Sequence, residues 1–202
     1  MKVFKGILYW FLSLTWGGIM TWLGLIIGFF LTITGHKPHR FHYNIYWNVG
    51  KSWGGLEFGA VFLTDSHDYL STKQHEHGHG LQNIILGPLS PFLVSIPSGF
   101  RYWFREMHGE KKKTIYTFVT TFITLALGTL PIVFGVVYNI MWLWIIGAIW
   151  EAYFLTVCGI WQACEIPKYN KFPQPYYDAV WFENQATVWG ERYFPEEKSL
   201  KK

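Results

Sequence analysis

Three long apolar runs constrain the fold of this chain more than any other feature of its sequence. The first covers residues 7–34 and contains no Asp, Glu, Lys or Arg. The second and third cover residues 114–136 and 138–163, with Glu151 as their single charged residue. Because about 20 apolar residues suffice for a helix to cross a bilayer, the first run predicts a transmembrane segment and the other two predict a transmembrane hairpin.

The composition and the flanking charges agree with a membrane environment. Only 15% of the residues are charged, against roughly 25% in soluble domains, and the 12 Trp and 12 Tyr are typical of rings that gather at lipid headgroups. Basic residues 111–113 flank the hairpin, and the positive-inside rule places the preceding section in the cytoplasm. We therefore expect the lipid bilayer as a partner and the inner (plasma) membrane as the location. Nucleic acid is not expected, since the sequence shows no basic stripe interleaved with polar residues.

These features predict an all-α membrane protein with about three transmembrane helices and a small membrane-apposed section. Within that section, glycines and aromatic and β-branched residues at 46–63 predict a short β-hairpin or an irregular strand. The pair Gly17-Gly18 leaves open whether the first run crosses once or folds back. The expected parts are residues 1–35 (N-terminal transmembrane segment), 36–113 (membrane-proximal section), 114–164 (transmembrane hairpin) and 165–202 (C-terminal helix and charged tail).

A polar helix is expected in the membrane-proximal section. Ser71-x-x-Gln74 has the form of a capping box at its start, and Gly87 followed by proline is a strong stop signal at its end. Gly78 and Gly80 lie inside it, although each costs a helix roughly 0.5–1 kcal/mol relative to Ala. Glycines at such positions indicate that another backbone comes close.

This helix carries the pattern His75-Glu76-His77-Gly78-His79. Residues four apart lie on one helix face, so His75 and His79 present ring nitrogens to one metal ion, and the pattern favours Zn²⁺. Glu76 is rotated aside and is expected to take a proton from a zinc-bound water, which would make it the catalytic base. His77 points away from that face, as a surface residue or as support for a ligand. A catalytic zinc needs a third protein ligand from elsewhere.

A downstream segment supplies a candidate for that ligand. Its pattern Glu183-x-x-Ala186-x-x-x-Gly190 resembles the Glu-x-x-Ala-Asp-x-x-Gly signature of gluzincin-type integral membrane metallopeptidases, the HtpX-like and CAAX prenyl protease group. The resemblance implies a zincin-like section and a metal site of His75, His79 and Glu183. In that group the Asp supports a zinc-binding histidine from behind. Thr187 stands there in this chain, so Asp178 or Glu191 would have to supply the missing acid, or the site is divergent.

The expected function is therefore that of a zinc metalloendopeptidase that cleaves a peptide or membrane-protein substrate in or near the membrane. Residues 56–63 would bind the substrate backbone as an edge strand, or form a plain structural hairpin. A non-catalytic scaffold that retains the metal site is one alternative, favoured by Thr187. A di-iron membrane oxygenase is another, but no histidine follows His108 to close its ligand set.

Overall fold

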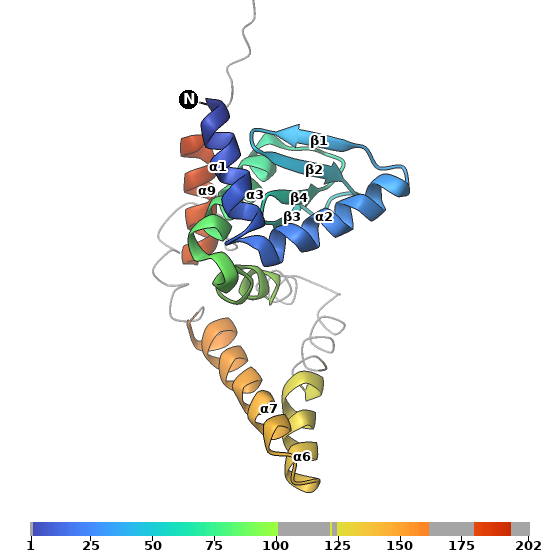
Figure 1. Ribbon diagram of the computed structural model, residues 1–202, viewed down its shortest axis with the longest axis vertical. Helices are drawn as coiled ribbons and strands as arrows, with labels where there is room; N and C mark the ends of the chain where they lie inside the picture. Colours follow the sequence, from blue (N-terminus) through green and yellow to red (C-terminus); the bar gives the residue numbers. More distant parts are fainter. Residues whose placement is uncertain (1, 101–121, 123–124, 162–179, 195–202) are drawn as a thin grey trace, which may run out of the picture. The chain divides into compact units, whose positions relative to one another are not determined.

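The computed structural model describes residues 2–100, 122, 125–161 and 180–194 (Figure 1). The chain forms two compact units, one made of residues 1–95 and 181–202 and the other of residues 96–180. The first unit contains the candidate site. Its main elements are α1 (Lys2–Leu14), α2 (Gly18–Ile33), β1 (Pro38–Phe41), β2 (Asn44–Asn48), β3 (Gly55–Phe58), β4 (Val61–Thr64), α3 (Leu70–Leu86) and α9 (Trp181–Tyr193).

The four strands form one mixed sheet in the order β1-β2-β4-β3. β1 and β2 form one antiparallel pair, β3 and β4 form another, and the parallel pairing of β2 with β4 joins the two. Tyr46 lies opposite Phe62 across this parallel pair, and their rings stack at 5.0 Å. The order leaves β1 and β3 at the two edges of the sheet, as Figure 1 shows.

Helix α2 packs on the sheet through a stripe of small residues. A Cβ at Gly24 would collide with Phe58 and Val61, and a Cβ at Gly28 would overlap the ring of Trp47. Glycine is therefore required for this close approach of helix and strands. Met20, Trp47, Phe58 and Val61 form the buried cluster between the two layers.

Helices α3 and α9 pack against each other almost backbone to backbone. A Cβ at Gly78 would overlap the carbonyl oxygen of Ala186, and a Cβ at Gly190 would overlap the carbonyl oxygen of Gln74. The expectation that glycines in the polar helix admit another backbone is confirmed. This contact brings residues more than one hundred positions apart in the sequence to one place.

The second unit contains two antiparallel apolar helices, α6 (Leu130–Val137) and α7 (Met141–Tyr153). The expected short connection is confirmed, because only residues 138–140 separate the helices and Asn139 has a positive φ of 54°. The π-helical segments Leu125–Thr129 and Phe154–Trp161 flank them. The carboxylate of Glu151 accepts a hydrogen bond from the hydroxyl of Thr129 at 3.0 Å.

The predicted fold class is wrong. The chain is not all-α with one short β-hairpin, because the first unit has a four-stranded mixed sheet. In the described residues, no individual helix combines the length and the apolar character that crossing a bilayer requires. The first apolar run is broken into α1 and α2, which meet at 95°. A second helical stretch, Leu70–Leu89, is bent by 116° against Pro91–Phe100, and by length and composition alone either bent pair could cross.

Both errors, the expected membrane-spanning helices and the missed four-stranded sheet, have a physical cause. Hydropathy counts apolar residues without asking what they pack against, and the small residues of α2 face the sheet. The strand β1 is mostly exposed and has the polar sequence Pro-His-Arg-Phe, so it shows no alternation of buried and exposed residues and no strand pattern.

Candidate metal centre

The helix that carries the histidine motif starts and stops for different reasons. Its end is the expected one, since Gly87 follows α3 with a positive φ of 56°, a conformation that glycine adopts without steric cost. The prediction that Ser71 and Gln74 form a capping box is wrong. Tyr69 is the N-cap and makes no side-chain cap, while the amide of Gln74 donates to the carbonyl oxygen of Phe194 at 2.7 Å. Gln74 therefore ties α3 to the end of α9.

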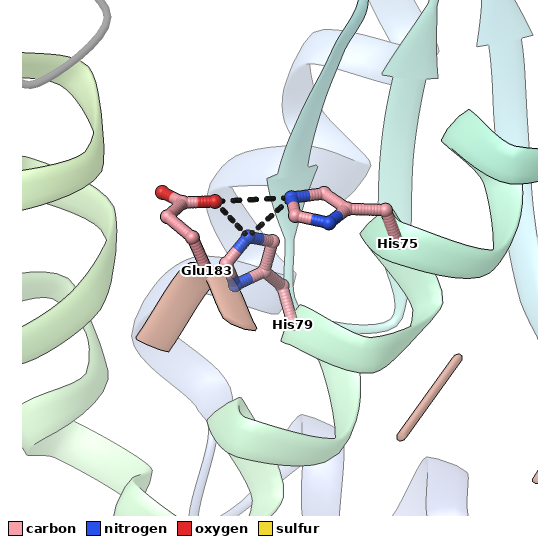
Figure 2. Close-up of side chains that lie close together, drawn as sticks. All are labelled: His75, His79 and Glu183. Carbon is pink, nitrogen blue, oxygen red and sulfur yellow. Dashed lines mark hydrogen bonds and ion pairs between the residues drawn. The ribbon is translucent and has the colours of Figure 1, made fainter. Parts of the chain in front are cut away.

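Three side chains from α3 and α9 converge on one point, as Figure 2 shows. Oε2 of Glu183 lies 3.0 Å from Nε2 of His75 and 3.2 Å from Nε2 of His79. The two Nε2 atoms are 3.0 Å apart, with their rings nearly perpendicular at 87°. Among the described residues, this is the one group of three or more His, Cys, Asp or Glu with metal-site spacing.

The other ring nitrogen of His75 contacts Thr187. Nδ1 of His75 lies 2.8 Å from Oγ1 of Thr187, on the next turn of α9 after Glu183. If Nδ1 donates to this hydroxyl, then Nε2 of a neutral His75 carries a lone pair that faces Glu183. Thr187 thus occupies the supporting position that the gluzincin signature gives to Asp. Glu191 is exposed, and Asp178 lies outside the described residues.

Gln82 orients the second imidazole, and the sequence reasoning missed this residue. Its amide nitrogen donates to the carbonyl oxygen of Phe182 at 2.8 Å and to the side chain of Gln185 at 2.9 Å. This arrangement turns Oε1 of Gln82 toward Nδ1 of His79, at 2.8 Å. Because Oε1 only accepts, Nδ1 must carry the proton, and Nε2 of a neutral His79 is left with a lone pair. The spacing of three residues from His79 was the available signal.

Three buried carboxylates lie near the two imidazoles. Glu57, Glu76 and Glu183 are each at most 5% exposed, and none of them pairs with a Lys or Arg in the part of the chain that the structure describes. Burial would raise the pKa of Glu183, but the imidazoles of His79 and His75 hold it well below its usual range. Buried charge without compensation is costly, so this set of groups requires a cation, either a proton or a metal ion.

Glu183 and two further buried glutamates determine the pKa of His79. Burial alone would lower the pKa of His79, yet the carboxylate of Glu183, assisted by Glu76 and Glu57, raises it to about 9. A proton between Glu183 and the imidazoles therefore balances part of the charge. A metal ion would take the place of this proton, since metal ligands must be deprotonated.

Glu76 lies beside the cluster and outside its hydrogen bonds. Its carboxylate is against Gly55, the first residue of β3, where a Cβ would overlap it. Burial raises the pKa of Glu76, while the imidazoles of His75 and His79 act in the opposite direction. A buried carboxylate with a raised pKa is a stronger base than an exposed glutamate, which suits it to exchange a proton with a water molecule at a metal site. Glu57, which the sequence reasoning did not single out, is a further buried acid on β3, and burial raises its pKa to about 7.

His77 is fully buried on the opposite side of α3, so its placement at the surface was wrong. Its ring lies 3.7 Å from Phe194 and 5.5 Å from Tyr9, between ring centroids. Neither ring nitrogen has a hydrogen-bond partner among the described residues. Burial lowers the pKa of His77 to about 3, so this histidine is a neutral packing residue.

The donor set fits a zinc ion. Ligands about 2.1 Å from a tetrahedral zinc lie roughly 3.4 Å from one another, so the observed spacing of 3.0–3.2 Å needs only a small expansion. Oε1 of Glu183 is buried and has no hydrogen-bond partner in the described part of the chain. Two imidazoles and one carboxylate are also a set of ligands known for catalytic zinc.

No protein-family profile, curated protein or solved structure matches this chain.

Proposed function

We propose that this protein is a zinc-dependent peptidase, with His75, His79 and Glu183 as the metal ligands. The observation that carries the proposal is the approach of two imidazole Nε2 atoms and one carboxylate oxygen to within 3.0–3.2 Å. Thr187 and Gln82 orient both imidazoles for metal binding. A structural role for the cluster alone would not require a buried acid directly beside it, yet Glu76 is buried there.

A bound zinc would polarise the substrate carbonyl and lower the pKa of a water molecule. Glu76 then takes a proton from the attacking water and returns it to the leaving amine. Its burial keeps bulk water away and holds its pKa above that of an exposed glutamate. Oε1 of Glu183 has no donor in the described residues, which leaves the carboxylate free to shift when a metal ion takes the place of the proton.

An extended peptide would bind along β3. This strand is at the edge of the sheet, and its first residue, Gly55, contacts the Glu76 carboxylate. An added strand would pair through its backbone with the edge of β3 that no other described strand occupies, which would bring its peptide bonds past Glu76. Leu56, 43% exposed on β3, offers an apolar contact to such a substrate.

Glu76→Gln tests this proposal in the full chain, with Glu191→Gln as the matched control on the exposed surface of α9. The wild type and both variants are purified, zinc is measured by mass spectrometry, and hydrolysis of an unfolded casein is followed. We expect about one zinc per chain in all three, as one metal site implies, and loss of hydrolysis in Glu76→Gln alone. Hydrolysis by Glu76→Gln at the wild-type rate would refute the assignment.

The alternatives predict other results. A non-catalytic scaffold would bind zinc and show no hydrolysis in the wild type. A di-iron oxygenase would contain iron, but of the described histidines only His75 and His79 belong to a group with metal-site spacing, which is too few for two iron ions in this part of the chain.

A further inference from the structure

Helices α1 and α2 present a large apolar surface that nothing in the described residues covers. The helices meet at 95°, and α2 uses its glycine stripe to pack on the sheet. Its opposite face is exposed and mostly apolar. The large exposed hydrophobic side chains of the two helices are Val3, Phe4, Ile7, Leu8, Phe11, Ile19, Trp22, Leu23, Ile26, Phe29, Phe30 and Ile33.

The polar side chains on this surface are already hydrogen-bonded within the protein. Thr15 donates to the carbonyl oxygen of Phe11 at 2.7 Å, and Thr34 donates to that of Phe30 at 3.1 Å. The indole nitrogen of Trp22, although the residue is 55% exposed, donates to the carbonyl oxygen of Leu14 at 3.1 Å. Polar groups in lipid need an internal partner, so this surface can lie against acyl chains without leaving these three groups unsatisfied.

The bend between α1 and α2 rests on the end of α3. The ring of Trp16 lies where a Cβ at Gly87 would stand, and its indole nitrogen donates to the carbonyl oxygen of Ile85 at 3.5 Å. The amide of Asn83 donates to the carbonyl oxygen of Gly17 at 3.1 Å. Trp16 and Ile85 are 52% and 62% exposed. The apolar surface therefore continues from the bend onto the end of α3.

The charges at the ends of this segment complement an anionic lipid surface. Residues 6–35 contain no Asp, Glu, Lys or Arg. Lys5 and Lys37, both exposed, stand on either side. Lysines beside an apolar segment are attracted to anionic headgroups by about 1 kcal/mol each.

We propose that the bend and the exposed face of α2 insert into one leaflet of an anionic phospholipid bilayer as a re-entrant wedge, so that the chain leaves the lipid on the side where it entered. Lys5 and Lys37 then lie at the same membrane surface. His79 is six residues before Ile85 on α3, which is roughly 9 Å at the rise of an α-helix. The wedge thus holds the metal centre close to the lipid surface. The inference does not depend on hydrolysis at that centre.

Single cysteines at Lys5→Cys and Lys37→Cys test the topology. Both are made in the full chain with Cys158→Ala and Cys164→Ala, and they are treated with a membrane-impermeant maleimide in bacterial spheroplasts and in inside-out membrane vesicles. We expect both cysteines to react in the same preparation and neither to react in the other. Reaction of the two cysteines from opposite sides would show that the segment crosses the bilayer, and would overturn the wedge.

A second measurement identifies what covers the surface. Phe29→Cys, in the same background, carries a nitrobenzoxadiazole label in vesicles of phosphatidylcholine and phosphatidylglycerol, with Lys51→Cys as the control at an exposed site of the first unit. Lipids brominated on their acyl chains should remove most of the fluorescence at position 29 and leave position 51 unchanged. Quenching of the Phe29→Cys label by aqueous iodide would overturn the proposal, as would protection from both quenchers, which would indicate a protein partner.

Discussion

Thr187 Oγ1 lies 2.8 Å from His75 Nδ1, across the interface between α9 and α3. This contact links the two helices that hold the candidate ligands. It also replaces the acidic support that the gluzincin signature would place at this position. A hydroxyl can accept a hydrogen bond from the imidazole N–H as a carboxylate would, but it adds no negative charge behind the ligand.

Thr187→Val should therefore weaken metal binding while keeping the shape of the side chain. The loss of a hydrogen bond to a ligating histidine reduces affinity by roughly tenfold to a hundredfold. Competition with a chromophoric zinc chelator measures this change, and Thr187→Ser, which keeps the hydroxyl, should bind as the wild type does. Equal zinc affinity in the Val variant would show that the contact does not support the metal site.

Gln82→Leu should lower both the stability of the fold and its affinity for zinc. The substitution removes the acceptor for Nδ1 of His79 and leaves the buried carbonyl oxygen of Phe182 without the donor that Gln82 provides. An unsatisfied buried group costs about 1–3 kcal/mol. Denaturant unfolding with a chelator present measures the free energy of unfolding, and zinc titration measures the affinity for the metal. Gln185→Ala removes only one of the bonds of Gln82, so it should have the smaller effect on both.

Gly78→Ala should separate α3 from α9. The new methyl group would overlap the backbone carbonyl of Ala186, and backbone cannot rotate away as a side chain does. Overpacking of this kind costs about 1–3 kcal/mol or more. We expect a lower midpoint of thermal unfolding together with weaker zinc binding. Gly99→Ala is the control, since a Cβ there meets nothing within 4 Å; an equal loss in both variants would contradict the packing argument.

The stability of chelator-treated protein should fall at alkaline pH. The pKa of His79 is raised to about 9 from its usual value near 6.5. A raised pKa stabilises the fold fully below the unfolded value, and this contribution is lost as pH increases through the folded value. Thermal unfolding midpoints should therefore decline between about pH 6.5 and 9 when zinc is chelated. Zinc-loaded protein should not show this decline, because the metal takes the place of the proton. A His79→Gln variant should lose the pH dependence.

Much of the candidate site could be predicted from sequence because it depends on local geometry. The helical period alone places His75 and His79 on one face, and Gly87 ends their helix as expected. Glu183 was assigned through a resemblance, and its approach to the imidazoles follows from the packing of α3 on α9. The capping box prediction failed because Gln74 donates instead to the carbonyl oxygen of Phe194, just after α9, and a local sequence pattern does not contain this distant partner.

The fold could be predicted from the sequence less well than the candidate site. Apolar runs report how much surface must be buried, and not whether a sheet or a lipid layer buries it. The sheet depends on the pairing of β2 with β4, between residues 16 positions apart such as Ile45 and Val61, and no local pattern encodes this pairing.

The order of residues in the chain sets the imidazole pair of α3 and the glycines that admit a neighbour, since each follows from backbone geometry over a few residues. Tertiary packing selects the carboxylate that meets the imidazoles, the residues that orient them, and the sheet that supports them. Those choices depend on distant segments coming together, and their energies arise from contacts that exist only after the chain has folded.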